Sequence, residues 1–207
     1  YAEGFRSGGF NFFAPEQYAQ SFRPQSVHSW ELGFKGHLSH SDFQYEMALY
    51  HMDIKNVQVQ SFLAPGFAVI VNENEALSEG MEGIVRYQPR LGWNGLASFS
   101  ANRTEFRPIH NAALDGVRVP YTSPYQGQIE IGYRHSSQFW FRLNVNGSRY
   151  QYLDIQQQGT RKGYVKLDAS LGYSWKKFDA SLFINNALDV KYDSVGILNG
   201  LAVAYSN

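Results

Sequence analysis

The residues of this chain that are able to do chemistry are scattered, and none of them forms a catalytic signature. The chain has no Gly-x-Ser-x-Gly, His-Glu-x-x-His or Walker-type lysine pattern, and it has no cysteine. His37 and His40 border a short turn with only Asp42 beside them, which is too few ligands for a metal site. Three other carboxylates could be a cluster for acid/base work, but on a long polar loop they are expected to be solvated charges: Asp53, Glu73 and Glu75. We therefore expect no catalytic, metal or cofactor site, and we do not expect an enzyme.

Candidates for ligand binding lie instead on the long polar segments, because binding residues concentrate on loops that a rigid scaffold positions. Arginine combined with aromatic side chains suits an anionic, partly aromatic ligand. The same residue types also occur on surface loops that bind nothing, so that reading stays open. The ligand-binding residues predicted on this basis are Arg23, Arg107, His110, Arg118 and Tyr121.

The composition narrows the class of protein. Lys plus Arg and Asp plus Glu both number 18, so the net charge is zero and nucleic acid is not an expected partner. No run of about 18 apolar residues is present, which excludes a transmembrane helix. The mean hydropathy of −0.38 is typical of a soluble protein. A β-barrel wall would give the same value, because only alternate residues face lipid. Aromatic residues make up 16% of the chain, and 14 of them are Tyr, which suits an interface between water and lipid.

Strict alternation of apolar and polar residues is the main structural signal, and it predicts β-strands. Between Val165 and Trp175 every second residue is apolar, and the residues between them are polar or Gly. Most of the segments exceed the usual five or six residues and suit a tilted membrane strand of about 9–11 residues. The fold class predicted is all-β, an antiparallel meander of about nine strands over 1–10, 27–38, 42–61, 76–88, 92–105, 122–135, 138–151, 163–175 and 178–193.

The connections between these segments alternate in length, as they do in outer-membrane barrels, where periplasmic turns are short and extracellular loops are long. The short turns are expected at 39–41, 89–91, 136–137 and 176–177, and the long loops at 11–26, 62–75, 106–121 and 152–162. Aromatic residues recur at the strand ends, where a membrane interface would place them. A soluble β-sandwich would account for scattered aromatics and for a polar face, and alternation alone does not say which face is wet.

Several segments resemble the C-terminal part of TonB-dependent outer-membrane receptors, in order and over essentially the whole chain. They are Tyr1-Ala-Glu-Gly-Phe-Arg-Ser-Gly-Gly-Phe-Asn, Pro15-Glu16 with Arg23-Pro24 and Trp30-Glu-Leu-Gly-Phe-Lys, Asn72-Glu-Asn-Glu-Ala-Leu-Ser-Glu-Gly-Met-Glu-Gly, Tyr121-Thr-Ser-Pro, and Phe183-Ile-Asn-Asn-Ala-Leu-Asp-Val-Lys-Tyr.

The resemblance implies a 22-stranded transmembrane β-barrel in the bacterial outer membrane, filled by an N-terminal plug. It implies TonB-coupled uptake of a scarce ligand, most commonly a ferric siderophore. Residues 1–207 would be the C-terminal portion of the barrel, without the plug, the early strands or the final strand. The Asn-Asn-Ala-Leu-Asp segment would lie in the penultimate strand. Expected partners are outer-membrane lipid, the plug of the same protein, the TonB complex through the absent N-terminal part, and the small-molecule ligand. A passive porin-like barrel and a soluble β-sandwich binding module are the alternatives.

Overall fold

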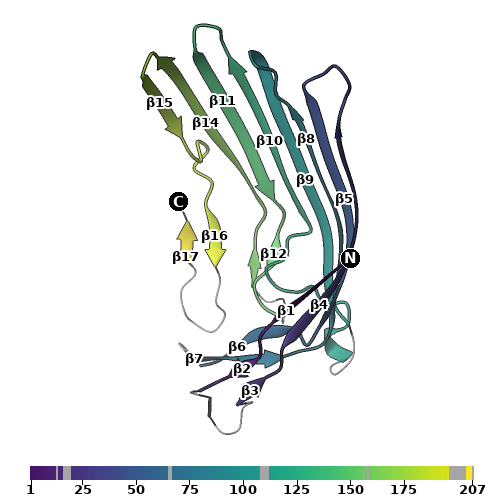
Figure 1. The fold of residues 1–207 in the computed structure, drawn as a ribbon. Coiled ribbons are helices and arrows are strands. Elements are labelled where there is room, and N and C mark those ends of the chain that lie inside the picture. The colour runs from purple at the N-terminus through teal and green to yellow at the C-terminus, as the bar shows by residue number, and fades with distance from the viewer. Residues whose placement is uncertain are drawn as a thin grey trace.

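A computed structural model describes residues 1–12, 14–15, 20–64, 67–107, 112–155, 157, 159–195 and 204–206. Its main feature is one antiparallel sheet of nine strands, which run next to one another in chain order (Figure 1). In sheet order the strands are β1 (Ala2–Arg6), β4 (Gln25–His37), β5 (Phe43–Lys55), β8 (Ala76–Tyr87), β9 (Gly92–Phe106), β10 (Tyr125–Arg134), β11 (Phe139–Ser148), β14 (Tyr164–Trp175) and β15 (Phe178–Ile184). The predicted meander of nine strands is confirmed.

Among the described residues, four two-stranded hairpins and one short helix lie outside the main sheet. They are β2 (Gly9–Phe10) with β3 (Ser21–Phe22), β6 (Gln58–Ala64) with β7 (Phe67–Asn72), β12 (Gln151–Tyr152) with β13 (Thr160–Arg161), β16 (Tyr192–Val195) with β17 (Ala204–Ser206), and the 3-10 helix η1 (Ala112–Leu114). In the described part of the chain, no helix is both long and apolar enough to span a membrane.

Three predicted boundaries were wrong, and a backbone turn explains two of them. The predicted strand 42–61 ends at Lys55 because Asn56 adopts a left-handed φ of +53°. The β6–β7 hairpin then takes up the last residues of that predicted strand and most of the predicted loop 62–75. The predicted strand 178–193 ends at Ile184. Asn186 and Asp189 have φ values of +51° and +48°, so Asn-Asn-Ala-Leu-Asp forms a turn after β15 and not part of a strand. The predicted strand 1–10 is divided between β1 and β2.

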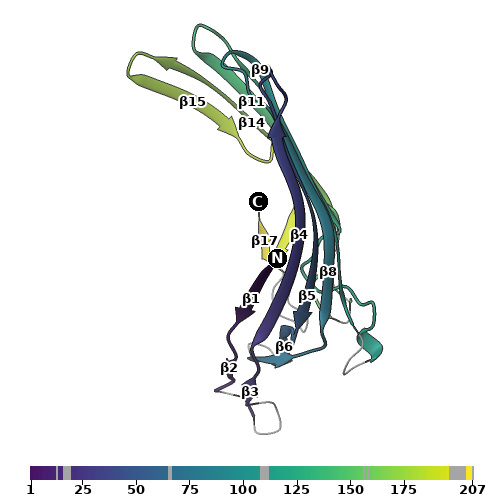
Figure 2. The same ribbon diagram turned by 45° about the vertical axis from the view of Figure 1, so that its right-hand side comes forward.

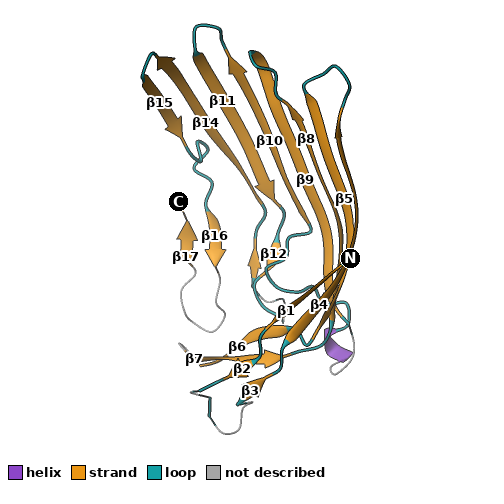
Figure 3. Ribbon diagram, viewed as in Figure 1, coloured by secondary structure: helices purple, strands orange, loops and turns teal. Residues whose placement is uncertain are grey.

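Loop lengths are sorted by edge, as predicted (Figure 3). The short connections 38–42, 88–91, 135–138 and 176–177 all lie at one end of the sheet, which we call the short-turn edge. The long connections 7–24, 56–75, 107–124 and 149–163 lie at the other end, the long-loop edge, together with the β2–β3 and β6–β7 hairpins. Three of the short turns contain a non-glycine residue with positive φ, which helps to reverse the chain: His40 at +58°, Gln138 at +69° and Lys176 at +54°.

The sheet is a single curved layer, bowed strongly when it is seen from the side (Figure 2). Strand register places Glu31, Glu82, Gln128 and the polar residues that alternate with the central apolar band on the concave face, where they line a hollow of about 880 Å³. The large apolar residues occupy the convex face and are exposed, for example Leu32 at 69% and Ile129 at 56%. In the described residues no second layer packs on these apolar side chains. A soluble β-sandwich would cover them with a facing sheet, so that alternative is wrong.

Rings of aromatic residues border the apolar convex face near the short-turn edge. Phe43 stacks on Tyr87 at a centroid distance of 4.6 Å, and Trp93 packs edge-on against Tyr133 at 5.2 Å. Strand β14 shows the height of the band between the two ends, because its convex residues run from Val165 to Trp175. Ten residue steps of about 3.3 Å, tilted by about 40°, give a height of about 25 Å. This is the height of the apolar band of outer-membrane barrels.

Candidate functional site

The candidate site is the concave wall together with the long loops that cover one end of it. On the wall, Glu46 accepts a hydrogen bond from Arg86 at 3.2 Å, and Arg142 forms an ion pair with Glu130 at 3.1 Å. Further polar residues that line the hollow are Glu31, Lys35, Glu82, Ser98, Ser100, Gln126, Gln128 and Asn146. Charges of both signs are stable here only against water or a polar partner, so the concave face is the wet face of the sheet.

Asp168 on β14 organises one side of this wall. Its Oδ2 atom accepts hydrogen bonds from the side-chain amides of Asn144 and Asn146 on β11, both at 3.3 Å. Its Oδ1 atom accepts a hydrogen bond from the backbone N–H of Asn186 at 2.7 Å. Asn186 in turn bonds both ways with the backbone of Val190. One carboxylate therefore joins two wall strands to the turn that follows β15.

The long loops are packed on a small core of their own at the end of the wall. Phe106, only 1% exposed, lies at the centre with Val57, Ala76 and Leu114. The loop after β9 is held there by backbone bonds, because Phe106 donates to Val117 and accepts from Gly116. Partly buried side chains that complete the core are Ile54, Val59, Val117, Val119 and Ile155. The core thus takes residues from three of the four long connections and fixes them to the sheet.

Side-chain amides tie the loop before β4 to the β6–β7 hairpin. Asn11 donates to the carbonyl of Ile70 at 2.8 Å and accepts from its N–H at 3.0 Å. Asn72 repeats the arrangement with Arg23, accepting from the N–H of Arg23 at 2.5 Å and donating to its carbonyl at 3.0 Å. An amide side chain that bonds both ways imitates one pair of a β-ladder. The two loops therefore form one ordered unit at the long-loop edge.

Two tyrosines and two cations form a stack at the N-terminal end of β14, at the long-loop edge. Tyr164 and Tyr192 are stacked at a centroid distance of 4.4 Å. The guanidinium of Arg161 lies 5.4 Å from the Tyr164 ring, and the ammonium of Lys166 lies 5.3 Å from the Tyr192 ring. Cations at this distance from an aromatic ring are attracted by its quadrupole. The stack places two positive charges and two phenol rings together, which is the chemistry that an anionic aromatic ligand would meet.

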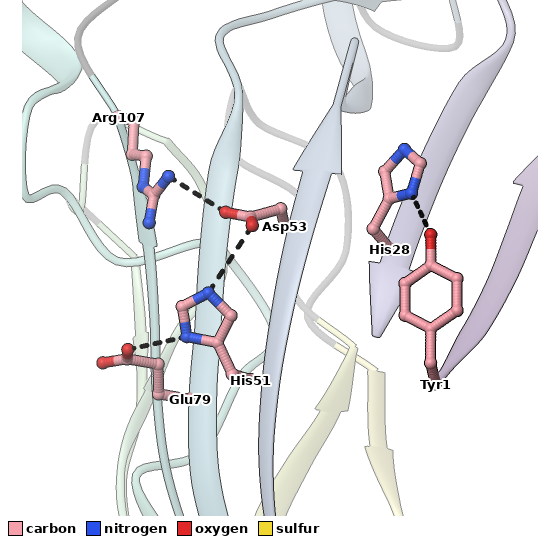
Figure 4. A network of polar contacts seen from close by, with 6 residues as sticks. All are labelled: Tyr1, His28, His51, Asp53, Glu79 and Arg107. Atoms are coloured by element: carbon pink, nitrogen blue, oxygen red, sulfur yellow. Dashed lines mark hydrogen bonds and ion pairs between the residues drawn. The ribbon is translucent and has the colours of Figure 1, made fainter. Parts of the chain in front are cut away.

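A polar network lies on the convex face at the long-loop edge (Figure 4). Its centre is His51, with Nδ1 2.9 Å from Glu79 and Nε2 3.5 Å from Asp53, and Asp53 forms an ion pair with Arg107 at 2.9 Å. Beside it, the Tyr1 hydroxyl lies 2.9 Å from Nδ1 of His28. We call the convex polar residues of this region the convex belt: Glu3, His28, His51, Asp53, Glu79, Arg103, Glu105 and Arg107.

The predicted ligand-binding residues do not form one cluster in the described part of the chain. Arg107 is held by Asp53 on the convex face, and Arg118 donates to the carbonyl of Asn102 at 3.3 Å. Arg23 is exposed and its backbone is bonded to Asn72, while His110 lies outside the described residues. Tyr121 has a φ of +62° and donates its N–H to Tyr152. Partial burial and the charge of Asp154 raise the pKa of Tyr121, so its phenol is protonated at neutral pH. A ligand role for these residues stays a prediction.

The three carboxylates named from the sequence are separated. Asp53 belongs to the convex belt, whereas Glu73 and Glu75 lie in the connection before β8. Partial burial raises the pKa of the Glu73 carboxyl. Among the described residues no group of three or more His, Asp or Glu side chains is arranged to hold a metal ion.

Sequence reasoning missed the His51 network and the tyrosine stack. His51 and Asp53 share a strand face by their spacing of two, but their pairing with Glu79 depends on strand register. Tyr164 and Tyr192 are far apart in sequence, and no local pattern brings them together.

A single-layer sheet with a wet concave face, an apolar convex band of about 25 Å and aromatic borders defines the wall of an outer-membrane β-barrel. The chain belongs to the TonB-dependent receptor family: residues 1–187 match the family model "TonB dependent receptor-like, beta-barrel". The family consists of receptors and transporters in the bacterial outer membrane. The resemblance inferred from the sequence is thus confirmed, and the porin-like alternative is wrong.

Solved structures of the same fold are siderophore receptors. The ferric yersiniabactin uptake receptor FyuA from Yersinia pestis matches with a TM-score of 0.81 at 24% identity, over 96% of this chain and 30% of that one. The ferric-catecholate import receptor Fiu from K12 E. coli matches at 0.71 and 21% identity, over 98% and 30%. The siderophore receptor PiuA from Acinetobacter baumannii matches at 0.70 and 20% identity, over 89% and 27%. This chain spans about a third of the length of each.

Proposed function

We propose that residues 1–207 are the C-terminal portion of the barrel of a TonB-dependent receptor that imports a ferric siderophore. The observation that carries the proposal is the wet concave wall with the tyrosine–cation stack at its long-loop end. Ferric siderophores are commonly anionic and carry aromatic groups, so the stack offers them both charge and ring contacts. The names of the structural neighbours, which are receptors for ferric yersiniabactin, ferric catecholates and other siderophores, favour the same class of ligand.

In this proposal the barrel has 22 strands, and the residues of this chain supply nine of them. The long-loop edge faces the outside of the cell and the short-turn edge faces the periplasm, because short turns are periplasmic in outer-membrane barrels. The mixed charges of the concave wall, such as Glu130 with Arg142, contact an N-terminal plug of the same protein. The TonB complex acts through that N-terminal part, so this chain supplies the ligand-facing wall and not the energy coupling.

Growth of a deletion strain tests the ligand class. We expect the strain, when starved of iron, to lose growth on at least one ferric siderophore from a panel of catecholate, phenolate and citrate types. The intact gene should restore growth. The gene that carries both Tyr164→Ala and Lys166→Ala should give uptake of radiolabelled iron that is about tenfold lower, which corresponds to a free-energy difference of about 1.4 kcal/mol.

The matched control for this pair is Lys176→Ala. The Lys176 ammonium lies 4.9 Å from the ring of Trp175, so it forms the same kind of contact but at the short-turn edge. This variant should import iron at the normal rate. Loss of growth on cobalamin or a glycan, with every ferric siderophore unaffected, would contradict the proposed ligand class.

A further inference from the structure

The long-loop end of β14 is paired on one side only. β15 pairs with β14 from Ala169 to Trp175, so residues 164–168 have β11 on one side and, among the described residues, no strand on the other. The chain that leaves β15 covers this side with a turn instead of a strand. The side chains of alternate β14 residues here lie on the concave face, because they pair with Asn146 and Ser148, which line the hollow. These concave residues are Tyr164, Lys166 and Asp168.

Asp168 holds the turn against β14. Its Oδ1 atom accepts a hydrogen bond from the backbone N–H of Asn186 at 2.7 Å, and the N–H of Ala187 donates to the carbonyl of Leu167, also at 2.7 Å. The side chain of Asn186 closes the turn on itself, because it bonds to both the N–H and the carbonyl of Val190 at 3.0 Å. The two bonds to β14 therefore fix the whole turn as one unit.

The groups around the Asp168 carboxylate are all hydrogen-bond donors. They are the backbone N–H of Asn186 and the side-chain amides of Asn144 and Asn146. An ionised carboxylate only accepts hydrogen bonds, so it satisfies three donors at once. Hydrogen bonds to a charged acceptor are also roughly twice as strong as those to a neutral one. A carboxylate therefore ties the turn to the wall more firmly than a hydroxyl or an amide would.

Tyr192 follows the turn by two residues, so the turn sets its position. Its ring stacks on that of Tyr164 at 4.4 Å with an interplanar angle of 23°, and the ammonium of Lys166 lies 5.3 Å from it. Tyr164 and Lys166 belong to β14 itself, whereas Tyr192 reaches them only because the chain turns back at Asn186. The bond between Asp168 and Asn186 therefore holds Tyr192 in the stack.

We propose that Asp168 is a positioning residue for ligand binding: it holds Tyr192 on Tyr164 through the turn at Asn186, and so completes the surface of two rings and two cations. Asp168 acts through Tyr192 and not by contact with the ligand. An anionic aromatic ligand then meets a preformed surface and does not bear the entropy cost of ordering the turn. The effect on ligand binding rests on the proposed function, whereas the positioning of Tyr192 does not.

Hydroxyl-radical labelling of the complete receptor, without ligand, tests the positioning of Tyr192. Asp168→Leu keeps the volume but removes both acceptors, so Tyr192 should be labelled about twofold faster, as measured by mass spectrometry. Asp168→Asn keeps one acceptor for the N–H of Asn186 and should give nearly the normal rate. Asn186→Gly keeps the positive φ but loses the bonds to Val190, so it should resemble Asp168→Leu.

The matched control is Asp179→Leu, because Asp179 pairs with Ser174 on the same concave face but near the short-turn edge. Labelling of Tyr192 should stay normal in this variant. Heat-modifiable migration on gels shows whether each variant is folded, and Asn186→Gly, which leaves the wall residues unchanged, replaces Asp168→Leu if the latter does not fold. Normal labelling of Tyr192 in the folded variant would overturn the proposal.

Uptake of radiolabelled iron, supplied in turn as a catecholate, a phenolate and a citrate complex, tests the effect on ligand binding. For the complex that the unaltered receptor imports, Asp168→Leu should raise KM about tenfold and leave the maximal rate unchanged, because the stack binds ligand and does not drive transport. Asp168→Asn should restore a nearly normal KM. In a Tyr192→Ala background, Asp168→Leu should have no further effect.

An unchanged KM in Asp168→Leu, or effects of Asp168→Leu and Tyr192→Ala that multiply, would overturn the proposal, because Asp168 would then not act through Tyr192. Failure of the proposed function looks different. Faster labelling of Tyr192 in Asp168→Leu, with no import of any of the three complexes by the unaltered receptor, would confirm the positioning and contradict the proposed ligand class.

Discussion

Replacing Phe106 by Ala should open the long-loop edge and cost about 3–5 kcal/mol of local stability. The ring is 1% exposed and is the largest side chain in the core that joins the β6 segment, the start of β8 and the loop after β9. Its removal leaves a cavity that Ala76 and Leu114 are too small to fill. Hydrogen exchange of the complete receptor should show faster exchange at the amides of Gly116 and Val119, which donate to the carbonyls of Phe106 and Thr104, respectively. The amide of Phe106, which donates to the carbonyl of Val117, belongs to the same backbone ladder.

Phe99→Ala is the control for this variant, because Phe99 is 44% exposed on the convex face of the same strand. Its loss should leave exchange at the long loops unchanged. The account of the loop core would be wrong if Phe106→Ala left the protection of residues 112–119 intact.

An arginine at Ile129 should destabilise the inserted barrel by about 2–4 kcal/mol, because a cation on the lipid face near the bilayer centre loses its hydration. Ile129 is 56% exposed and stands mid-strand on the convex face of β10. Its neighbour Gln128 points to the concave hollow, where Gln128→Arg should change stability by less than about 1 kcal/mol. Denaturant titration of the receptor folded into vesicles compares the two, and equal costs would contradict the assignment of the faces.

The sheet could be predicted from sequence because period-two alternation is a local property that each strand shows by itself. Val165 to Trp175 alternates without a break, and the structure makes it β14. The boundary at Lys55 could not be predicted in this way, because Asn56 turns the chain within a segment whose composition still suits a strand. The β6–β7 hairpin was missed for the same reason.

The sites depended on information that alternation does not contain. Which face is wet follows from the curvature that places Glu31 and Gln128 in one hollow. The position of the convex belt depends on the register of five strands, because a shift of one residue would move His51 to the other face. The stack of Tyr164 on Tyr192 depends on the turn at Asn186, which Asp168 fixes from the wall.

The most direct test of the central claim, that the convex face meets lipid and the concave face is wet, is a spin-label scan along β9. This chain has no cysteine, so single cysteines can be placed in turn at residues 97 to 101 and labelled in the complete receptor in vesicles. We predict that labels at Ala97, Phe99 and Ala101 are relaxed by oxygen dissolved in lipid, and labels at Ser98 and Ser100 by a water-soluble nickel complex. Accessibility without a period of two, or with the two sets exchanged, would contradict the claim.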